Sequence, residues 1–153
     1  MEKIRNPQEL EKLKKEILAR EKPNGLQVTV CGGTGCLANG SAVVAQAFAE
    51  EIKKQGLDGK VVLKKTGCHG FCERGPVVIL HPQEVFYQRV AEKDTAEIIA
   101  ETVKQGKVID RLLYADPQTN QKIVRHDEIP FYKHQMRIAL RNNWLGYRRL
   151  SII

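Results

Sequence analysis

Residues 26–36 read LQVTVCGGTGC and residues 60–72 read KVVLKKTGCHGFC, and these two stretches decide the fold. Each begins as a short run rich in β-branched residues, which favours a strand, and then breaks into glycine and cysteine. All four cysteines of the chain follow these runs, spaced as C-x4-C and C-x3-C: Cys31, Cys36, Cys68 and Cys72. Each predicted strand therefore leads directly into a pair of thiols.

The segments around these strands predict an α/β layer. Residues 41–55 form an amphipathic helix, residues 76–80 and 85–90 flank a turn with hairpin character, and Asp94 caps a helix that runs to residue 103. The side chains expected to face the core from the two helices are Val43, Val44, Ala47, Phe48, Ile52, Ile98, Ile99 and Val103. Strand, crossover helix and second strand form a right-handed parallel unit. The hairpin and the last helix extend it into a thioredoxin-like layer.

The two ends of the chain read differently from this central layer. Asn6 caps an amphipathic N-terminal helix over residues 6–21, and its apolar face carries Leu10, Leu13, Ile17 and Leu18. From Gln105 onward the periodicity weakens, so we expect one short element in residues 110–117, a short basic helix over residues 131–141 and no second core.

Three regions follow from this reading of the chain. They are an N-terminal helix (residues 1–22), a thioredoxin-like domain (residues 23–108) and an irregular C-terminal linker or tail (residues 109–153).

Composition places the chain among ordinary globular proteins. Its 153 residues are 42% hydrophobic and 28% charged. No apolar run approaches the roughly 18 residues of a membrane span, and the first residues contain no apolar segment typical of a secretory signal. We therefore expect a cytoplasmic protein that does not insert into a membrane. In that reducing compartment, cysteines serve as metal ligands or redox thiols more often than as disulfides.

The net charge of +7 is concentrated toward the C-terminus. Residues 110–153 hold eight Lys or Arg against four Asp or Glu. These basic residues are not clustered with stacking aromatic residues, so the pattern favours a solvated or partner-facing segment over nucleic-acid binding.

The placement of the thiols indicates an iron-sulfur site. Loops at the carboxyl ends of neighbouring parallel strands lie at the same edge of a sheet, where ligands collect. Glycines beside the thiols keep backbone N–H groups accessible, and such groups hydrogen-bond to the sulfurs of an anionic cluster. The glycines concerned are Gly32, Gly33, Gly35, Gly67 and Gly70. The sequence therefore predicts a [2Fe-2S] cluster on the four thiols.

Two other functions of the thiols stay open. A zinc-stabilised interaction module is one, although structural zinc usually takes C-x2-C pairs. A thioredoxin-like thiol oxidoreductase is the other, although its dithiol also prefers C-x-x-C at a helix start. Between the second pair, His69 is expected to donate to a sulfur or to lie on the surface. Arg74 either offsets cluster charge or pairs with Glu73 in solvent.

The motif resembles a known family. The four cysteines, Gly75-Pro76, the apolar strand after them, His81-Pro82 and Tyr87 resemble the thioredoxin-like [2Fe-2S] ferredoxin domain. With the preceding helix, Asp110-Arg-Leu and FYKHQMRIALRN at 131–142, the chain is similar to the N-terminal region of a larger subunit. That subunit is the NADH-binding flavin subunit of complex I-like NADH dehydrogenases and of NAD-reducing and electron-bifurcating iron hydrogenases.

The resemblance implies a function and a set of partners. It makes Cys31, Cys36, Cys68 and Cys72 the cluster ligands, each local pair on one iron. It also implies one-electron transfer within an NADH:acceptor oxidoreductase, alongside flavin- and iron-sulfur-containing subunits. We expect no catalytic residue, and a homo-oligomer stays open.

The end of the chain adds a further expectation. In the family a flavin and NADH domain follows residue 142, whereas this chain continues with residues 143–153. We therefore expect no FMN or NAD site in this chain, no oxidation of NADH by it alone, and a truncated, frameshifted or split form of the subunit.

Overall fold

A four-stranded sheet forms the centre of the computed structural model, which describes residues 4–20 and 25–136. Its strands, in the order β2-β1-β3-β4, are β1 (Leu26–Cys31), β2 (Val61–Thr66), β3 (Val78–His81) and β4 (Val85–Tyr87). β1 and β2 are parallel, whereas β3 is antiparallel to both β1 and β4. The helix α3 (Ser41–Lys54) connects the parallel strands. The predicted βαβ unit followed by a hairpin is confirmed.

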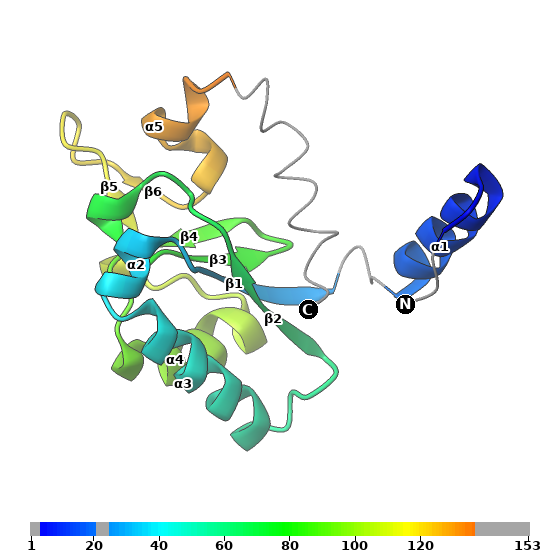
Figure 1. The fold of residues 1–153 in the computed structure, drawn as a ribbon. Helices are drawn as coiled ribbons and strands as arrows, with labels where there is room; N and C mark the ends of the chain where they lie inside the picture. Colours follow the sequence, from blue (N-terminus) through cyan, green and yellow to red (C-terminus); the bar gives the residue numbers. More distant parts are fainter. Residues whose placement is uncertain (1–3, 21–24, 137–153) are drawn as a thin grey trace.

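Shorter elements surround the sheet, and several of them are single turns. They are α1 (Pro7–Arg20), α2 (Thr34–Ala38), η1 (Cys72–Arg74), η2 (Glu92–Asp94), α4 (Thr95–Glu97), η3 (Ile98–Val103), η4 (Asp110–Leu112), β5 (Tyr114–Ala115), β6 (Lys122–Ile123), η5 (His126–Glu128) and α5 (Pro130–Lys133). In Figure 1, α3 and α4 lie on one side of the sheet, whereas β5, β6 and α5 lie on the other.

Because both faces of the sheet are covered, the strand residues alternate between two cores. Val78 and Leu80 of β3 join the core that contains Phe48 of α3. Their neighbours Val77 and Ile79 join the second core on the opposite face. Successive side chains of a strand point to opposite faces, so one continuous apolar run serves both cores.

The face of α3 differs from the prediction at Val43 and Ala47. Val44, Ala45, Phe48 and Ile52 are buried as their helical spacing requires, whereas the predicted Ala47 is only half-buried and Val43 is 53% exposed. One residue along an α-helix turns the side chain by about 100°. Because Val44 faces the core, Val43 points away from it, and its predicted place in the core was wrong.

The helix predicted from Asp94 to Val103 is present but irregular. It begins as the 3₁₀ turn η2, continues as α4 and ends as η3, a π-helical stretch with Ile98 and Ile99 fully buried. Asp94 makes no side-chain cap hydrogen bond at the start of α4, but it caps the start of η2 as the third residue of its first turn. Its carboxylate accepts the Ala91 N–H at 2.8 Å and pairs with Arg111 at 2.8 Å.

The N-terminal helix α1 forms with the predicted cap, because Asn6 Oδ1 accepts the Glu9 N–H at 2.8 Å. Its apolar face is not covered by described residues at Leu10 and Leu13, which are 55% and 40% exposed. The side chains of Ile17 and Leu18 lie outside the described part of the structure.

The segment after residue 104 corrects the prediction that no second core exists. Ile109, Leu112 and Leu113 close the core beneath α3. Tyr114 and Tyr132 help to build the second core on the other face. These side chains come from turns and two-residue strands, which leave no periodic pattern. The helix expected over residues 131–141 is too long, because α5 ends at Lys133 and residues 134–136 are not helical. Residues 137–141 lie outside the described part.

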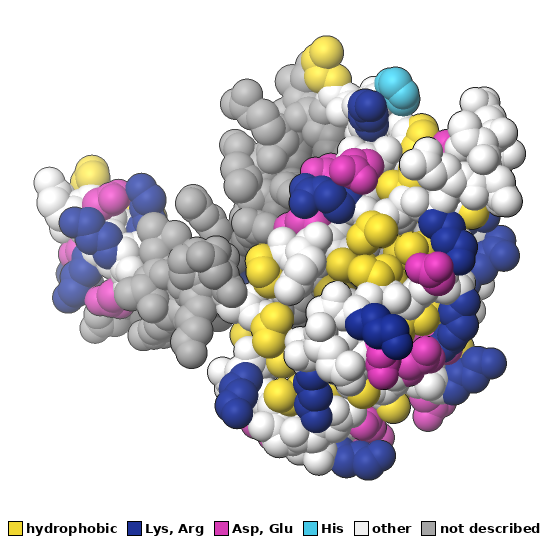
Figure 2. All heavy atoms as spheres, turned by 180° about the vertical axis from the view of Figure 1, so that it is seen from behind, with side chains coloured by type: hydrophobic (Ala, Val, Ile, Leu, Met, Phe, Trp, Pro, Cys, Tyr) yellow, Lys and Arg dark blue, Asp and Glu magenta, His cyan; other side chains and the backbone are white. Residues whose placement is uncertain are grey.

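On the face shown in Figure 2, lysine and arginine side chains are interspersed with aspartate and glutamate. Hydrophobic side chains are visible between them. Within the described residues, no helix has the length and apolar character needed to cross a bilayer.

Candidate metal centre

The first pair of thiols lies at the end of β1, in the middle of the sheet. Cys31 is the last residue of this strand, and Cys36 lies in the short helix α2 that follows at once. Both are 1% exposed. The Cys31 N–H donates to the Val77 carbonyl at 3.0 Å, which fixes the backbone at this thiol. Sequence reasoning placed a loop here and missed α2, because five residues around a glycine carry no helical pattern.

The second pair follows β2 and faces solvent. Cys68 and Cys72 are both exposed, and their Sγ atoms lie 3.8 Å apart. The Gly70 N–H donates to Cys68 Sγ at 3.3 Å, which is a glycine amide hydrogen-bonded to a sulfur, as predicted. Cys31 Sγ lies 3.5 Å from the Gly67 carbonyl oxygen, which links the first pair to this loop.

Three glycines let the two cysteine loops meet, because an added Cβ atom would overlap a cysteine. At Gly33 that atom would lie 2.8 Å from Cys68 Cβ, and at Gly35 it would lie 2.9 Å from Cys72 Cβ. At Gly75 it would lie 2.7 Å from Cys36 Sγ. The strand register explains the meeting, since Cys31 pairs directly with Thr66 in the parallel ladder. The two cysteine loops are therefore in direct contact.

The pKa values of two of the thiols, Cys36 and Cys72, are raised above the ordinary cysteine value. Burial, followed by hydrogen bonding to Cys31, raises the pKa of Cys36 to about 12. Hydrogen bonding to Cys68, followed by electrostatic repulsion from the Cys68 thiolate, raises the pKa of Cys72. Metal binding requires thiolates, and a bound cation deprotonates a coordinating thiol. All four cysteines are free thiols, the donor type that holds an iron-sulfur cluster.

The thiols lie as two pairs. Within the described residues, no three His, Cys, Asp or Glu side chains are grouped so as to hold one metal ion. A two-iron cluster takes two protein ligands at each iron, so two local pairs are compatible with it.

Two charged or titratable residues beside the second pair have partners. His69 is half-buried, and its Nε2 lies 3.0 Å from Thr66 Oγ1. Arg74 pairs with Glu73 at 3.0 Å and also lies over the ring of Tyr114, 5.4 Å from its centroid. The predicted Glu73–Arg74 pair is present, and Tyr114 is a partner that local sequence did not reveal.

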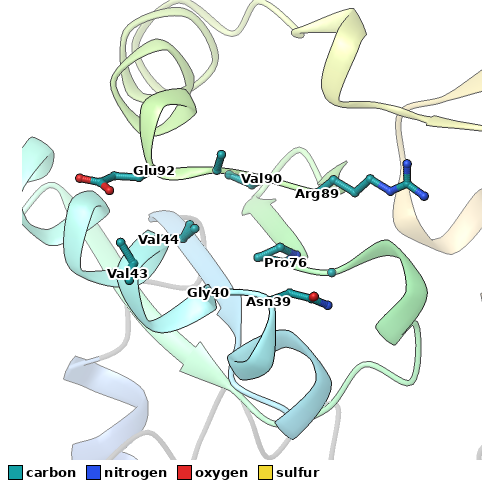
Figure 3. Close-up of a pocket in the computed structure, with 10 residues that line it drawn as sticks. Asn39, Gly40, Val43, Val44, Pro76, Arg89, Val90 and Glu92 are labelled. Atoms are coloured by element: carbon teal, nitrogen blue, oxygen red, sulfur yellow. The ribbon is translucent and has the colours of Figure 1, made fainter.

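A groove of about 470 Å³ opens beside the cysteine loops. Figure 3 shows Arg89 and Glu92 pointing in opposite directions, with Val44, Pro76 and Val90 between them. Gly75 also lines the groove, and its backbone lies against Cys36 Sγ. A group seated in this groove therefore comes close to the first thiol pair.

A separate cluster joins the β3–β4 turn to η5. His81 Nδ1 lies 2.8 Å from Glu84 Oε1, and His126 Nδ1 lies 3.1 Å from Glu84 Oε2. Burial alone would raise the pKa of the Glu84 carboxyl. The hydrogen bonds and electrostatic attraction of His126 and His81 outweigh burial and hold this pKa well below its ordinary value.

The variant Glu84→Gln is expected to lower the free energy of unfolding at pH 7 by roughly 1.5–3 kcal/mol, the range for hydrogen bonds to a charged group. Because the folded pKa is depressed, the carboxylate contributes fully above its unfolded pKa of about 4.3 and loses this contribution as pH falls further. The difference from the parent chain should therefore shrink below about pH 4.

Urea unfolding at a series of pH values measures this difference. The control is Glu128→Gln, whose side chain is 62% exposed and lies 3.9 Å from Arg125; it should change stability by less than about 0.5 kcal/mol. A difference that stays constant from pH 7 to pH 3 would show that the Glu84 carboxylate is not the group responsible.

Known proteins share this arrangement. The family profile described as thioredoxin-like [2Fe-2S] ferredoxin matches residues 17–103. A 2Fe-2S ferredoxin of Clostridium pasteurianum is 34% identical over 77 residues, which cover 50% of this chain and 76% of that protein. One of Aquifex aeolicus (strain VF5) is 38% identical over 79 residues, covering 51% and 71%.

A solved structure agrees with the sequence relatives. The thioredoxin-like [2Fe-2S] ferredoxin from Aquifex aeolicus superposes with a TM-score of 0.55 at 33% identity, covering 61% of this chain and 99% of that one. Fold and sequence similarity agree, and the chain belongs to the thioredoxin-like [2Fe-2S] ferredoxin family.

Proposed function

We propose that this chain transfers one electron at a time through a [2Fe-2S] cluster held by four thiolates, those of Cys31, Cys36, Cys68 and Cys72. Membership in the family implies the cluster, and its chemistry when bound is the reversible uptake of one electron. The observation that carries the assignment of ligands is the contact between the two cysteine loops at Gly33, Gly35 and Gly75. Only glycine permits that contact.

The burial of the thiols gives the site an inner and an outer side. Cys31 and Cys36 are 1% exposed, whereas Cys68 and Cys72 face solvent. A redox partner can approach the outer pair directly. Solvent exposure and hydrogen bonds to sulfur both tune reduction potential, so the two sides contribute differently to it.

The wider context that we propose is a module of an NADH:acceptor oxidoreductase. Its support is the resemblance of Asp110-Arg-Leu and residues 131–142 to the segment that precedes the flavin domain in NADH dehydrogenase and hydrogenase subunits. Flavin- and iron-sulfur-containing subunits are then the partners. In this arrangement residues 109–153 lead toward the flavin-containing part of the assembly.

Anaerobic reconstitution of the full chain with ferrous iron and sulfide tests the proposal. We expect about two irons and two sulfides per chain, visible absorption and an EPR signal after reduction by dithionite. A colourless protein that retains zinc instead would establish the zinc-stabilised module. Reduction of protein disulfides by the metal-free chain would establish the thiol oxidoreductase.

Reduction by NADH tests the context separately. NADH should leave the reconstituted chain oxidised and should reduce it after addition of a flavin-containing NADH dehydrogenase subunit. Reduction by NADH with the chain alone would overturn the expectation that the flavin and NADH site lies in a partner.

A further inference from the structure

Aromatic side chains from the segment after the domain cover the loop of the second thiol pair. Phe71 lies inside this loop, between Cys68 and Cys72, and is 7% exposed. The ring of Phe131 stacks on it, with centroids 4.6 Å apart and planes at 6°. The rings of Tyr114 and Tyr132 lie 5.5 and 5.8 Å from it. We call Tyr114, Phe131 and Tyr132 the aromatic brace.

The brace also contacts the backbone of the loop. Gly70 has a φ of +81°, and a Cβ atom there would lie 3.5 Å from Phe131 Cζ. The Phe131 ring therefore lies against the peptide that donates an N–H to Cys68 Sγ. The same ring stacks on Phe71 and lies beside Gly70.

The segment that carries the brace is attached to the sheet and is not a loose extension. The Phe86 N–H donates to the Val124 carbonyl at 2.8 Å, and Val85 forms an antiparallel bridge with Arg125. Ile129, two residues before Phe131, is fully buried. The backbone thus holds Phe131 over the cysteine loop from the edge of β4.

The three residues of the aromatic brace lie beyond the match to the family profile, which ends at residue 103. The second core, in contrast, combines Cys31, Cys36 and Phe71 with Tyr114 and Tyr132. The hydrophobic surroundings of the thiols are therefore completed by a segment outside the matched region.

We propose that Phe131 is a positioning residue for Cys68 and Cys72. Its ring fixes Phe71 and Gly70, and through them the outer thiol pair. In the metal-free chain this limits local opening of residues 68–75. In the loaded chain, a consequence that rests on the proposed function, it slows the loss of iron from the outer side.

Hydrogen exchange of the metal-free full chain tests the brace without any cluster. In Phe131→Ala, the amides of Arg74 and Gly75, which donate to the Phe71 and Cys72 carbonyls, should exchange roughly two- to tenfold faster. Exchange in α3 should not change. Phe131→Tyr, which keeps the stacked ring, should restore slow exchange at both amides.

The matched control is Leu13→Ala. Leu13 is 40% exposed and Phe131 is 37% exposed, so both variants remove a similar apolar side chain, but Leu13 lies in α1. This control should leave exchange at Arg74 and Gly75 unchanged. If Phe131→Ala also speeds exchange in α3, the Phe131→Leu variant replaces it as the test, because leucine keeps the apolar bulk and loses only the stacking. Faster exchange at Arg74 and Gly75 in Phe131→Leu then supports the brace.

The loaded chain gives the second measurement, the rate at which a chelator removes iron. Phe131→Ala should lose iron roughly two- to tenfold faster than the parent chain and Leu13→Ala. Unchanged exchange at Arg74 and Gly75 in Phe131→Ala and Phe131→Leu would overturn the brace. A parent chain that takes up no iron would instead overturn the proposed function. The brace would still be tested by hydrogen exchange, because that measurement uses the metal-free chain.

Discussion

Alanine in place of any one of the four cysteines should leave the chain folded but unable to retain its iron. Each pair supplies both protein ligands of one iron in the proposed cluster, so a single substitution leaves one iron with only one protein ligand. Iron per chain after anaerobic reconstitution should fall from about two to near zero.

The inner and outer cysteines should differ in what their loss does to stability. Removing the exposed thiols of Cys68 or Cys72 should change the free energy of unfolding of the metal-free chain by less than about 0.5 kcal/mol. Removing the buried thiols of Cys31 or Cys36 should cost about 1–2 kcal/mol, because a small cavity remains. Urea unfolding of the metal-free variants measures both.

Ser41→Ala provides a buried control for these variants. Ser41 is 2% exposed, and its Oγ has no hydrogen-bond partner in the described part of the chain. Its replacement should retain full iron and should not lower stability, because it removes an unsatisfied polar atom. Full iron retention by Cys68→Ala or Cys72→Ala would refute the assignment of that residue as a ligand.

Gly33→Ala should separate the two cysteine loops without changing any ligand. Gly33 has φ −64° and ψ 153°, a conformation that alanine adopts readily, so the effect is steric. The new Cβ would lie 2.8 Å from Cys68 Cβ and 3.1 Å from Cys68 Sγ. Overpacking should destabilise the arrangement in which the two cysteine loops touch by about 1–3 kcal/mol. Iron retention should therefore fall roughly tenfold or more.

Gly59→Ala separates this steric effect from general destabilisation. Gly59 has nothing within 4 Å of an added Cβ, but its φ of +72° makes alanine strained by about 1–2 kcal/mol. Urea unfolding should show that this control is destabilised while iron analysis shows full loading. Full loading of Gly33→Ala would mean that the cysteine loops tolerate a wider separation than their contact indicates.

The sequence predicted the sheet and the contact between the two cysteine loops because both depend on local pattern. Strands β1 and β2 are short β-branched runs that stop at glycine, and parallel pairing brings their ends to one edge. The spacing of Cys31, Cys36, Cys68 and Cys72 then indicated iron-sulfur chemistry without knowledge of any contact.

The features missed from the sequence depend on contacts between distant segments. Phe131 stacks on Phe71 across 60 positions of sequence, and no periodicity in residues 109–132 marks the buried Tyr114 or Ile129. Helix α2 is too short for a helical pattern, and Val43 matched the apolar composition of α3 but not its buried face. Such features follow from packing, which propensity alone does not encode.

The register of β1 and β2 has a consequence for the speed of electron exchange. The Cys31 N–H is hydrogen-bonded to Val77 and the Gly32 N–H to Thr66, so the inner loop is tied to two neighbouring strands. Ligands on a frame of this kind shift little between oxidation states, which keeps the reorganisation energy small. We therefore expect the rate of exchange to be set mainly by the distance to the partner and the driving force.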